Sequence, residues 1–144
     1  MRQAVVTSFN QRTMIYEVVY SLCSQTIRPK RIILVDDGST DQVSLQILNE
    51  IEAGCNFPIP ILVISQSNRG VSSARNAGIR EAQASFVLVL DEDDKQETFF
   101  VEEVSKSLYG NPSIIAASSY LRTFGVLETV VRPIGEAMLP HSFR

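Results

Sequence analysis

Short apolar runs alternate along the chain with stretches of helical periodicity, and this alternation limits the possible folds more than any other feature. Five runs rich in β-branched residues are predicted strands: residues 4–7, 31–36, 59–64, 86–90 and 114–118. Each run is nearly all apolar, as expected for parallel strands that are covered on both faces. Such strands alternating with helices are typical of parallel sheets with crossover connections. The chain is therefore predicted to be an α/β protein with a mostly parallel sheet flanked by helices.

The segments between the predicted strands show the period of helices that pack on a sheet. The first places five apolar residues on one face: Ile15, Val18, Val19, Leu22 and Cys23. In the second, Ser39 and Gln42 have capping-box spacing, so Ser39 is the expected N-cap, and Gly54 is the expected stop. The third carries small residues, among them Ala74 and Gly78, that suit close packing on a sheet.

A fourth helix is expected where Phe100, Val104 and Leu108 recur at helical spacing before a break at 110–112. Beyond it the pattern weakens, and a late antiparallel strand is expected within 123–131. The sequence has no internal repeat and no linker, so residues 1–144 are expected to form a single domain.

Composition excludes several classes of protein. Of the 144 residues, 44% are hydrophobic and 20% are charged, which is ordinary for a soluble domain, and no apolar run could span a bilayer. The net charge of −3 argues against nucleic acid as the main partner. Cys23 and Cys55 lie far apart and are expected to be free thiols in a reducing compartment. The expected location is the cytoplasm, with attachment to the inner face of a membrane left open.

Ligands of open parallel sheets bind at the carboxyl ends of the strands. Four polar loops follow the predicted strands at those ends: residues 8–11, 36–41, 66–70 and 91–94. All four are expected to converge at one edge of the sheet, where the functional site is predicted.

The loop after the fourth strand is Asp91-Glu92-Asp93-Asp94. Four adjacent carboxylates repel one another, so their presence at a strand end needs a reason. A hard cation such as Mg²⁺ or Mn²⁺ supplies one, because it is often held by one or two carboxylates together with substrate phosphates. The simpler interpretation is a solvated acidic turn that stabilises the N-terminus of the next helix. On the residues alone, both interpretations stay open.

A phosphatase is a third interpretation of this loop. A hydrophobic strand followed by Asp-x-Asp resembles the nucleophile loop of haloacid-dehalogenase-like phosphatases, with Asp91 attacking phosphorus and Asp93 as the acid. That family carries the loop on its first strand and needs a later lysine. Here the loop follows the fourth strand, and no lysine follows Lys106, so this interpretation is disfavoured.

Two other segments bring polar groups toward the same edge. A turn after the second strand needs one carboxylate, but two are present, Asp36 and Asp37. The second carboxylate could accept hydrogen bonds from a nucleobase or a ribose. Arg75 lies one turn into the third helix, where it could contact a phosphate or pair with the acidic loop; a surface ion pair is the simpler interpretation. Neither G-x-G-x-x-G nor the P-loop motif occurs, which disfavours dinucleotide and P-loop nucleotide binding.

The order and spacing of these segments resemble the N-terminal half of family 2 glycosyltransferases. That family begins with a strand and a P-T-Y-N-like loop, followed by S-x-x-x-Q-T, V-D-D-G-S-T-D, N-x-G-x-x-x-A-R-N-x-G and L-D-x-D-D. The matching stretches here are residues 7–10, 21–26, 35–41, 68–78 and 90–94. Thr7 and Phe9 replace the commoner proline and tyrosine.

The resemblance implies a GT-A, Rossmann-like fold and transfer of a sugar from a nucleotide-diphosphate donor, most often a UDP-sugar, to an acceptor hydroxyl, usually with inversion. It implies six residues that bind the donor nucleotide: Ser8, Phe9, Asp36, Asp37, Arg75 and Asp91. Asp93 would bind Mn²⁺ or Mg²⁺ on the diphosphate. The implied partners are a nucleotide-sugar donor and a glycan or lipid-linked acceptor, in glycan or polysaccharide biosynthesis.

The family's general base, a carboxylate in a later segment, has no counterpart here. The remaining acidic residues lie outside that context: Glu97, Glu102, Glu103, Glu128 and Glu136. His141, the only histidine, is weak evidence for a base because it stands alone near the chain end. Inverting transfer needs a base beside the attacking hydroxyl, so the sequence is expected to stop before the acceptor half. The alternative is a nucleotide-sugar-binding module that does not catalyse transfer.

Overall fold

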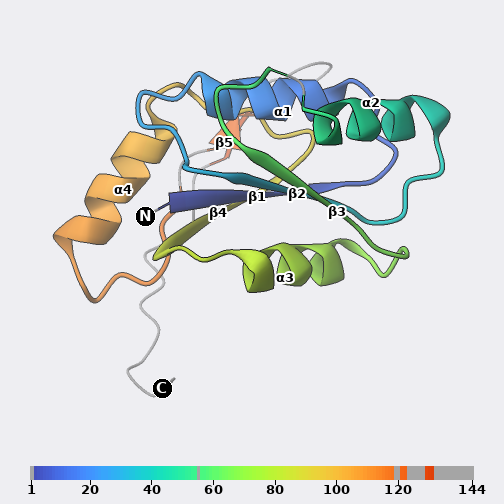
Figure 1. Ribbon diagram of the computed structural model, residues 1–144. Coiled ribbons are helices and arrows are strands. Elements are labelled where there is room, and N and C mark those ends of the chain that lie inside the picture. Colours follow the sequence, from blue (N-terminus) through green and yellow to red (C-terminus); the bar gives the residue numbers. More distant parts are fainter. Residues whose placement is uncertain (1, 55, 119–120, 123–128, 132–144) are drawn as a thin grey trace. The chain divides into compact units, whose positions relative to one another are not determined.

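The computed structural model describes residues 2–54, 56–118, 121–122 and 129–131 (Figure 1). The chain forms two compact units, Met1–Phe99 and Phe100–Arg144. The first contains the parallel sheet and the second contains the last helix.

The first unit is built on a four-stranded parallel sheet in the order β3-β2-β1-β4. Its strands are β1 (Arg2–Ser8), β2 (Ile32–Asp36), β3 (Ile61–Ser65) and β4 (Phe86–Asp91). The central strands β1 and β2 are almost entirely buried, which is why they are nearly all apolar. The register sets Ser8 beside Asp36 and Thr7 beside Asp91, so the polar strand ends lie at one edge.

Helices cover both faces of this sheet (Figure 1). α1 (Met14–Cys23) and α2 (Gln42–Glu52) lie on one face, and α3 (Val71–Glu81) lies on the other. The buried residues of α1 are the five predicted from its periodicity, and the apolar residues of α2 join them in the larger hydrophobic core. Gly54, with φ of +97°, follows the end of α2 as predicted. The flanked parallel sheet confirms the predicted fold class.

α3 packs closely on the sheet because it presents small residues to it. Ala74 and Gly78 are its buried residues. A β-carbon added to Gly78 would stand only 2.3 Å from Cγ1 of Val5 on β1, so a side chain there would push the helix and the sheet apart. The predicted small-residue face of this helix is confirmed.

The N-cap of α2 differs from the prediction. Asp41, not Ser39, caps the helix, and its carboxylate accepts hydrogen bonds from the N–H and the hydroxyl of Ser44, both at 3.0 Å. The N–H of Ser39 instead donates to the carboxylate of Asp36 at 3.1 Å, and its hydroxyl accepts from the N–H of Asn10 at 3.0 Å. Because Ser39 bonds to Asp36 and to Asn10 in the loop after β1, it does not cap α2, and the helix begins later than the capping-box spacing indicates.

The second unit contains α4 (Phe100–Gly110) and an antiparallel pair of short strands, β5 (Leu121–Arg122) and β6 (Val130–Val131). The helix is confirmed, and β6 falls within the segment expected to hold a late antiparallel strand. The predicted strand at 114–118 is wrong, and Ile115 within it is 67% exposed. An apolar run becomes a strand only where a neighbour accepts its hydrogen bonds, and in the described part of the chain no strand pairs with this one.

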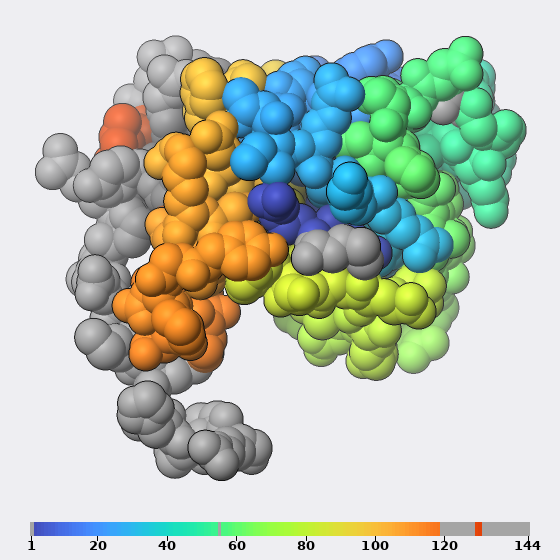
Figure 2. Space-filling view, turned by 60° about the vertical axis from the view of Figure 1, so that its left-hand side comes forward, coloured from blue at the N-terminus to red at the C-terminus, as the bar shows by residue number. Residues whose placement is uncertain are grey.

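Figure 2 shows the edge of the sheet at which β1 begins. The first residues of β1 (dark blue) lie next to the segment that leads into β2 (light blue). The N–H of Lys30 donates to the carbonyl of Arg2 at 2.9 Å, and the N–H of Gln83 donates to the side chain of Gln3 at 3.0 Å. Gln3 is buried, and its side chain joins the start of β1 to the segment that follows α3.

Cys23 is a buried free thiol, and burial raises its pKa although the charge of Arg28 lowers it. Cys55 lies outside the described residues. Among the described residues, no helix is both long enough and apolar enough to cross a bilayer.

Candidate functional site

A pocket of about 380 Å³ lies at the carboxyl edge of the sheet in the first unit. Its lining comes from all four loops expected to converge there and from the start of α3: Thr7, Ser8, Phe9, Gln11, Asp37, Asn68, Gly70, Val71, Ala74, Asp91, Glu92 and Asp93. The parallel strands end together at this edge, so residues far apart in the sequence meet. Most residues named from the sequence line the pocket, whereas Asp36 and Arg75 do not.

Asp37 joins the end of β2 to the segment that leads into α3. Its carboxylate accepts hydrogen bonds from Nε2 of Gln66 at 2.7 Å, from the N–H of Arg69 at 3.0 Å and from the N–H of Gly70 at 2.8 Å. Burial alone would raise the pKa of this carboxyl, but these hydrogen bonds and the charge of Arg69 outweigh it and hold the pKa below its ordinary value. The pocket wall therefore carries an ionised carboxylate tied to the start of α3.

Asp36 has a different place. It is 3% exposed, and both of its carboxylate oxygens lie within hydrogen-bonding distance of the N–H of Ser39, at 3.1 and 3.3 Å. Asp36 therefore holds the turn that follows β2. Of the two adjacent aspartates, only Asp37 lines the pocket.

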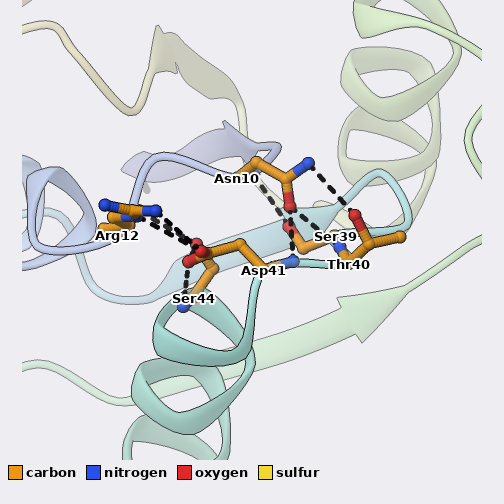
Figure 3. A network of polar contacts seen from close by, with 6 residues as sticks. All are labelled: Asn10, Arg12, Ser39, Thr40, Asp41 and Ser44. Atoms are coloured by element: carbon orange, nitrogen blue, oxygen red, sulfur yellow. Dashed lines mark hydrogen bonds and ion pairs between the residues drawn. The ribbon is translucent and has the colours of Figure 1, made fainter.

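The loop after β1 is held against the start of α2 by side chains (Figure 3). Oδ1 of Asn10 accepts hydrogen bonds from the N–H groups of Thr40 and Asp41, at 2.8 and 2.9 Å. Arg12 forms an ion pair with Asp41 at 3.1 Å, and its N–H donates to the hydroxyl of Ser44 at 3.0 Å. Asn10 and Arg12 have φ of 59° and 52°, the only positive values for non-glycine residues in the described part of the chain. Such conformations are costly, and the surrounding hydrogen bonds maintain them.

Asp91, at the end of β4, is engaged by its neighbours. Nη2 of Arg75 lies 2.6 Å from its Oδ2, and the hydroxyl of Thr7 donates to its Oδ1 at 2.8 Å. Of the two possibilities raised for Arg75, this structure contains the pairing with the acidic loop. Both partners are more than one-third exposed, so the pair contributes little to stability, and its main effect is to orient Asp91 and balance its charge.

Glu92 connects the acidic loop to the loop after β1. Its Oε1 accepts a hydrogen bond from the N–H of Phe9 at 3.1 Å, and its own N–H donates to the carbonyl of Thr7 at 3.1 Å. Burial raises the pKa of Glu92 to about 7. The negative charges of Asp93 and Asp91 also raise this pKa, whereas the hydrogen bond from the N–H of Phe9 lowers it. Near neutral pH this carboxyl is therefore partly protonated.

Asp93 is the exposed carboxylate of the pocket. It accepts no side-chain hydrogen bond from any of the described residues, whereas Asp91 is already paired with Arg75. The described residues contain no group of three or more side chains that could hold a metal ion by themselves. A carboxylate such as Asp93 still fits Mg²⁺ or Mn²⁺ where substrate phosphates complete the ligand set.

The hydroxyl of Ser8 is buried at the pocket wall without a hydrogen-bond partner. Ser8 is 1% exposed. A buried hydroxyl left unpaired costs about 1–3 kcal/mol, so a ligand group that reached it would be bound more favourably. Nε of Arg75 is the other buried side-chain atom of this kind among the described residues.

Sequence reasoning did not single out Thr7, Gln66 or Glu92 as individual parts of the site. Glu92 lies within the acidic run, which was a signal for it, but its contact with Phe9 joins two loops that are distant in the sequence. The only sequence signal for the other two is their position: Thr7 lies near the end of β1, and Gln66 directly follows β3.

Among the acidic residues considered as a general base, Glu97 is the one described in the same unit as the pocket, and it does not line the pocket. Glu97 is exposed, and Glu102 and Glu103 form ion pairs with Lys106, each at 2.8 Å. The other candidates lie outside the described residues: Glu128, Glu136 and His141.

Curated relatives of this chain are named as glycosyltransferases. The chain is 31% identical over 118 residues to the cholesterol galactosyltransferase of Borreliella burgdorferi, which covers 81% of the chain and 32% of the relative. It is 28% identical over 135 residues to the poly-beta-1,6-N-acetyl-D-glucosamine synthase of Staphylococcus epidermidis, which covers 88% of the chain and 31% of the relative. The chain thus spans about a third of the length of these relatives.

Solved structures share the fold of the chain. S. aureus TarS 1–349 in complex with UDP-GlcNAc has a TM-score of 0.64 at 28% identity, over 76% of this chain and 31% of the TarS 1–349 chain. The mannosyltransferase PcManGT from Pyrobaculum calidifontis, in complex with GDP-Man and Mn²⁺, has a TM-score of 0.66 at 20% identity, over 78% of this chain and 33% of the enzyme. At that lower identity, the second similarity supports the fold alone.

A family model gives the broadest match. The model described as glycosyl transferase family 2 matches residues 3–143, which include the pocket and the acidic loop. The expected resemblance is thus confirmed over nearly the whole sequence. The chain belongs to glycosyl transferase family 2.

Proposed function

We propose that this chain is the donor-binding part of a glycosyltransferase that transfers a sugar from a UDP-sugar to an acceptor hydroxyl. The observation that carries the proposal is the pocket in which Ser8, Phe9, Asp37 and the acidic loop meet. A nucleoside diphosphate suits such a pocket, because it combines a flat base, hydrogen-bonding ribose hydroxyls and phosphates that need a cation. The complex of TarS with UDP-GlcNAc supports uridine as the nucleoside.

Individual pocket residues suit separate parts of this donor. Phe9 is 40% exposed and offers a ring face on which a base can stack. The unpartnered hydroxyl of Ser8 can bond to a ribose or base group. Asp37 is an ionised acceptor for an imide N–H or a ribose hydroxyl. Asp36 is assigned an indirect role, as the residue that holds the turn beside Asp37.

Asp93 is the proposed ligand of Mn²⁺ or Mg²⁺. Its carboxylate is exposed at the pocket, while Asp91 is oriented by Arg75 and Thr7. When bound, a divalent ion neutralises charge on the diphosphate leaving group. Arg75 and Asp91 together keep the acidic loop in position and reduce the repulsion between its carboxylates.

The acceptor and its general base are assigned to parts of the protein other than this pocket. Inversion requires a base beside the attacking hydroxyl, and Glu97, the acidic candidate described in the same unit as the pocket, does not line it. The name of the poly-beta-1,6-N-acetyl-D-glucosamine synthase supports a glycan acceptor. We assign the reaction to the cytoplasm, at the inner face of a membrane if the acceptor is lipid-linked.

A nucleotide-sugar-binding module without transferase activity is the second candidate. The observation that favours it is that Glu97, the candidate base described in the same unit as the pocket, does not line it. Sugar transfer by this chain that Asp93→Ala abolishes would exclude the second candidate. Hydrolysis of the donor alone does not decide between them, because water can replace the acceptor.

A thermal-shift comparison of nucleotides tests the proposed donor. UDP, GDP and ADP are each added at the same concentration with Mn²⁺, and UDP is expected to raise Tm most. A ligand present at 100 times its Kd stabilises the folded state by about 2.7 kcal/mol, which such a measurement detects. Equal Tm values with all three nucleotides and with Mn²⁺ alone would contradict the proposal.

A further inference from the structure

Asn10 lies beside the pocket and connects two of the loops that form it. Its Oδ1 accepts hydrogen bonds from the N–H groups of Thr40 and Asp41, and its Nδ2 lies 3.4 Å from the hydroxyl of Thr40 (Figure 3). Its own N–H donates to the hydroxyl of Ser39 at 3.0 Å. Asn10 itself does not line the pocket, but Phe9, the residue before it, does.

Two hydrogen bonds hold the backbone on either side of Phe9. Its own N–H donates to Glu92 in the loop after β4, and the next N–H, that of Asn10, donates to Ser39 in the loop after β2. The two anchors come from opposite neighbours of β1 in the sheet. The backbone of Phe9 is therefore fixed between the loops of both neighbouring strands.

The conformation of Asn10 points to the same role. Its φ of 59° lies in the left-handed region, which asparagine adopts more readily than most residues but still at some cost. Strained residues of this kind cluster at ligand sites, where the surrounding structure holds them. Here the hydrogen bonds to Thr40 and Asp41 are the contacts that hold the strained residue.

We propose that Asn10 is a positioning residue that holds Phe9 in place and thereby sets the affinity for the nucleobase end of the donor. This inference rests on the proposed function, because it assigns the base to Phe9. A purely structural Asn10 would alter stability, or the binding of every part of the donor, whereas a positioning residue for Phe9 alters binding of the base and leaves diphosphate binding unchanged.

The test compares UDP with inorganic pyrophosphate, which lacks the base and ribose, by calorimetry in Mg²⁺. Asn10→Ala is expected to weaken UDP binding about tenfold, as for a loop that adopts the binding geometry about a tenth of the time, and to leave pyrophosphate binding unchanged. Asn10→Asp keeps an oxygen acceptor for Thr40 and Asp41 and is expected to restore most of the UDP affinity. Asn49→Ala, at an exposed position of α2, is the matched control and should bind like the wild type.

Folding of each variant is checked by circular dichroism. If Asn10→Ala does not fold, Asn10→Gly replaces it. Glycine adopts this φ without strain, and it too lacks the side-chain oxygen that accepts from Thr40 and Asp41. Unchanged UDP affinity in the folded variant, or an equal loss for UDP and pyrophosphate, overturns the inference and leaves the proposed function standing. A folded wild-type chain that does not bind UDP overturns the proposed function and this inference with it.

Discussion

Replacement of Gly78 by alanine should destabilise the first unit although alanine is the better helix former. The added β-carbon would lie 2.3 Å from Cγ1 of Val5 and 3.1 Å from Cγ2 of Val35. Non-bonded carbons pack at about 3.5–4.0 Å, so the nearer contact requires a movement of about 1 Å. Val5 and Val35 are fully buried on the two central strands, which are hydrogen-bonded on both sides, and their branched side chains have few alternative rotamers.

The expected loss follows from two opposing effects. Overpacking of a core costs about 1–3 kcal/mol, and this contact belongs at the upper end of that range because the overlap is large. Replacement of glycine by alanine within a helix stabilises the helix by about 1 kcal/mol. Gly78→Ala is therefore expected to lower the free energy of unfolding by about 2 kcal/mol, as measured by urea denaturation followed by circular dichroism.

A double mutant isolates the contact itself. Val5→Ala removes the two γ-methyl groups of Val5, which would lie 2.3 and 3.2 Å from the new β-carbon, leaves the contact with Val35, and by itself costs about 2–3 kcal/mol. In the double mutant the new methyl group occupies the vacated space, so the combined loss should fall short of the sum by about 2 kcal/mol. Gly110→Ala, where no atom lies within 4 Å, is the control and should not destabilise the chain. Strictly additive losses, or a Gly78→Ala variant as stable as the wild type, would refute the reasoning.

Three more outcomes are expected. Gly70→Ala should cost about 1–3 kcal/mol in urea denaturation from its backbone conformation alone, because φ is +89° and no atom stands near the added carbon; unchanged stability would contradict this. The folded-state pKa of Asp37 is lowered, so the ionised carboxylate stabilises the fold fully above its unfolded pKa of about 4, and this stabilisation is lost as pH falls through the folded pKa. The difference in unfolding free energy between the wild type and Asp37→Asn should therefore shrink over that pH range; a constant difference would contradict this. Arg75→Met should reduce stability by less than about 1 kcal/mol, since its ion pair with Asp91 is partly exposed, yet it should weaken metal-dependent UDP binding measured by calorimetry; several kcal/mol of lost stability with unchanged binding would be the opposite result.

The sequence predicted the framework because burial and periodicity act locally. The buried face of α1 matches its apolar spacing, and each of the four strands of the sheet overlaps one of the predicted apolar runs, although their ends differ by one or two residues. The convergence of the four loops also followed from the topology, since parallel strands end at one edge. The run at 114–118 failed because an apolar composition does not provide a pairing partner.

The contacts within the site could not be predicted in the same way. Asp36 and Asp37 are adjacent and chemically identical, and only the three-dimensional structure shows that Asp36 binds Ser39 while Asp37 binds the segment before α3. Ser39 was the expected cap, but its hydroxyl and the N–H of Asp41 both bind Asn10, which belongs to another loop. The contacts of Asp37 with Arg69 and of Asn10 with Ser39 and Asp41 join segments about thirty residues apart, which local patterns do not encode.

Calorimetric titration of the chain with UDP, with and without Mn²⁺, tests the central claim most directly. The wild type should bind UDP more tightly in Mn²⁺, and Asp93→Asn, which keeps the shape of the side chain but removes its charge, should lose that gain. Glu52→Gln, at an exposed position of α2, is the matched control and should keep it. Binding that is absent in the folded wild type, or equal in the wild type and Asp93→Asn with Mn²⁺, would contradict a metal-dependent donor site at this pocket.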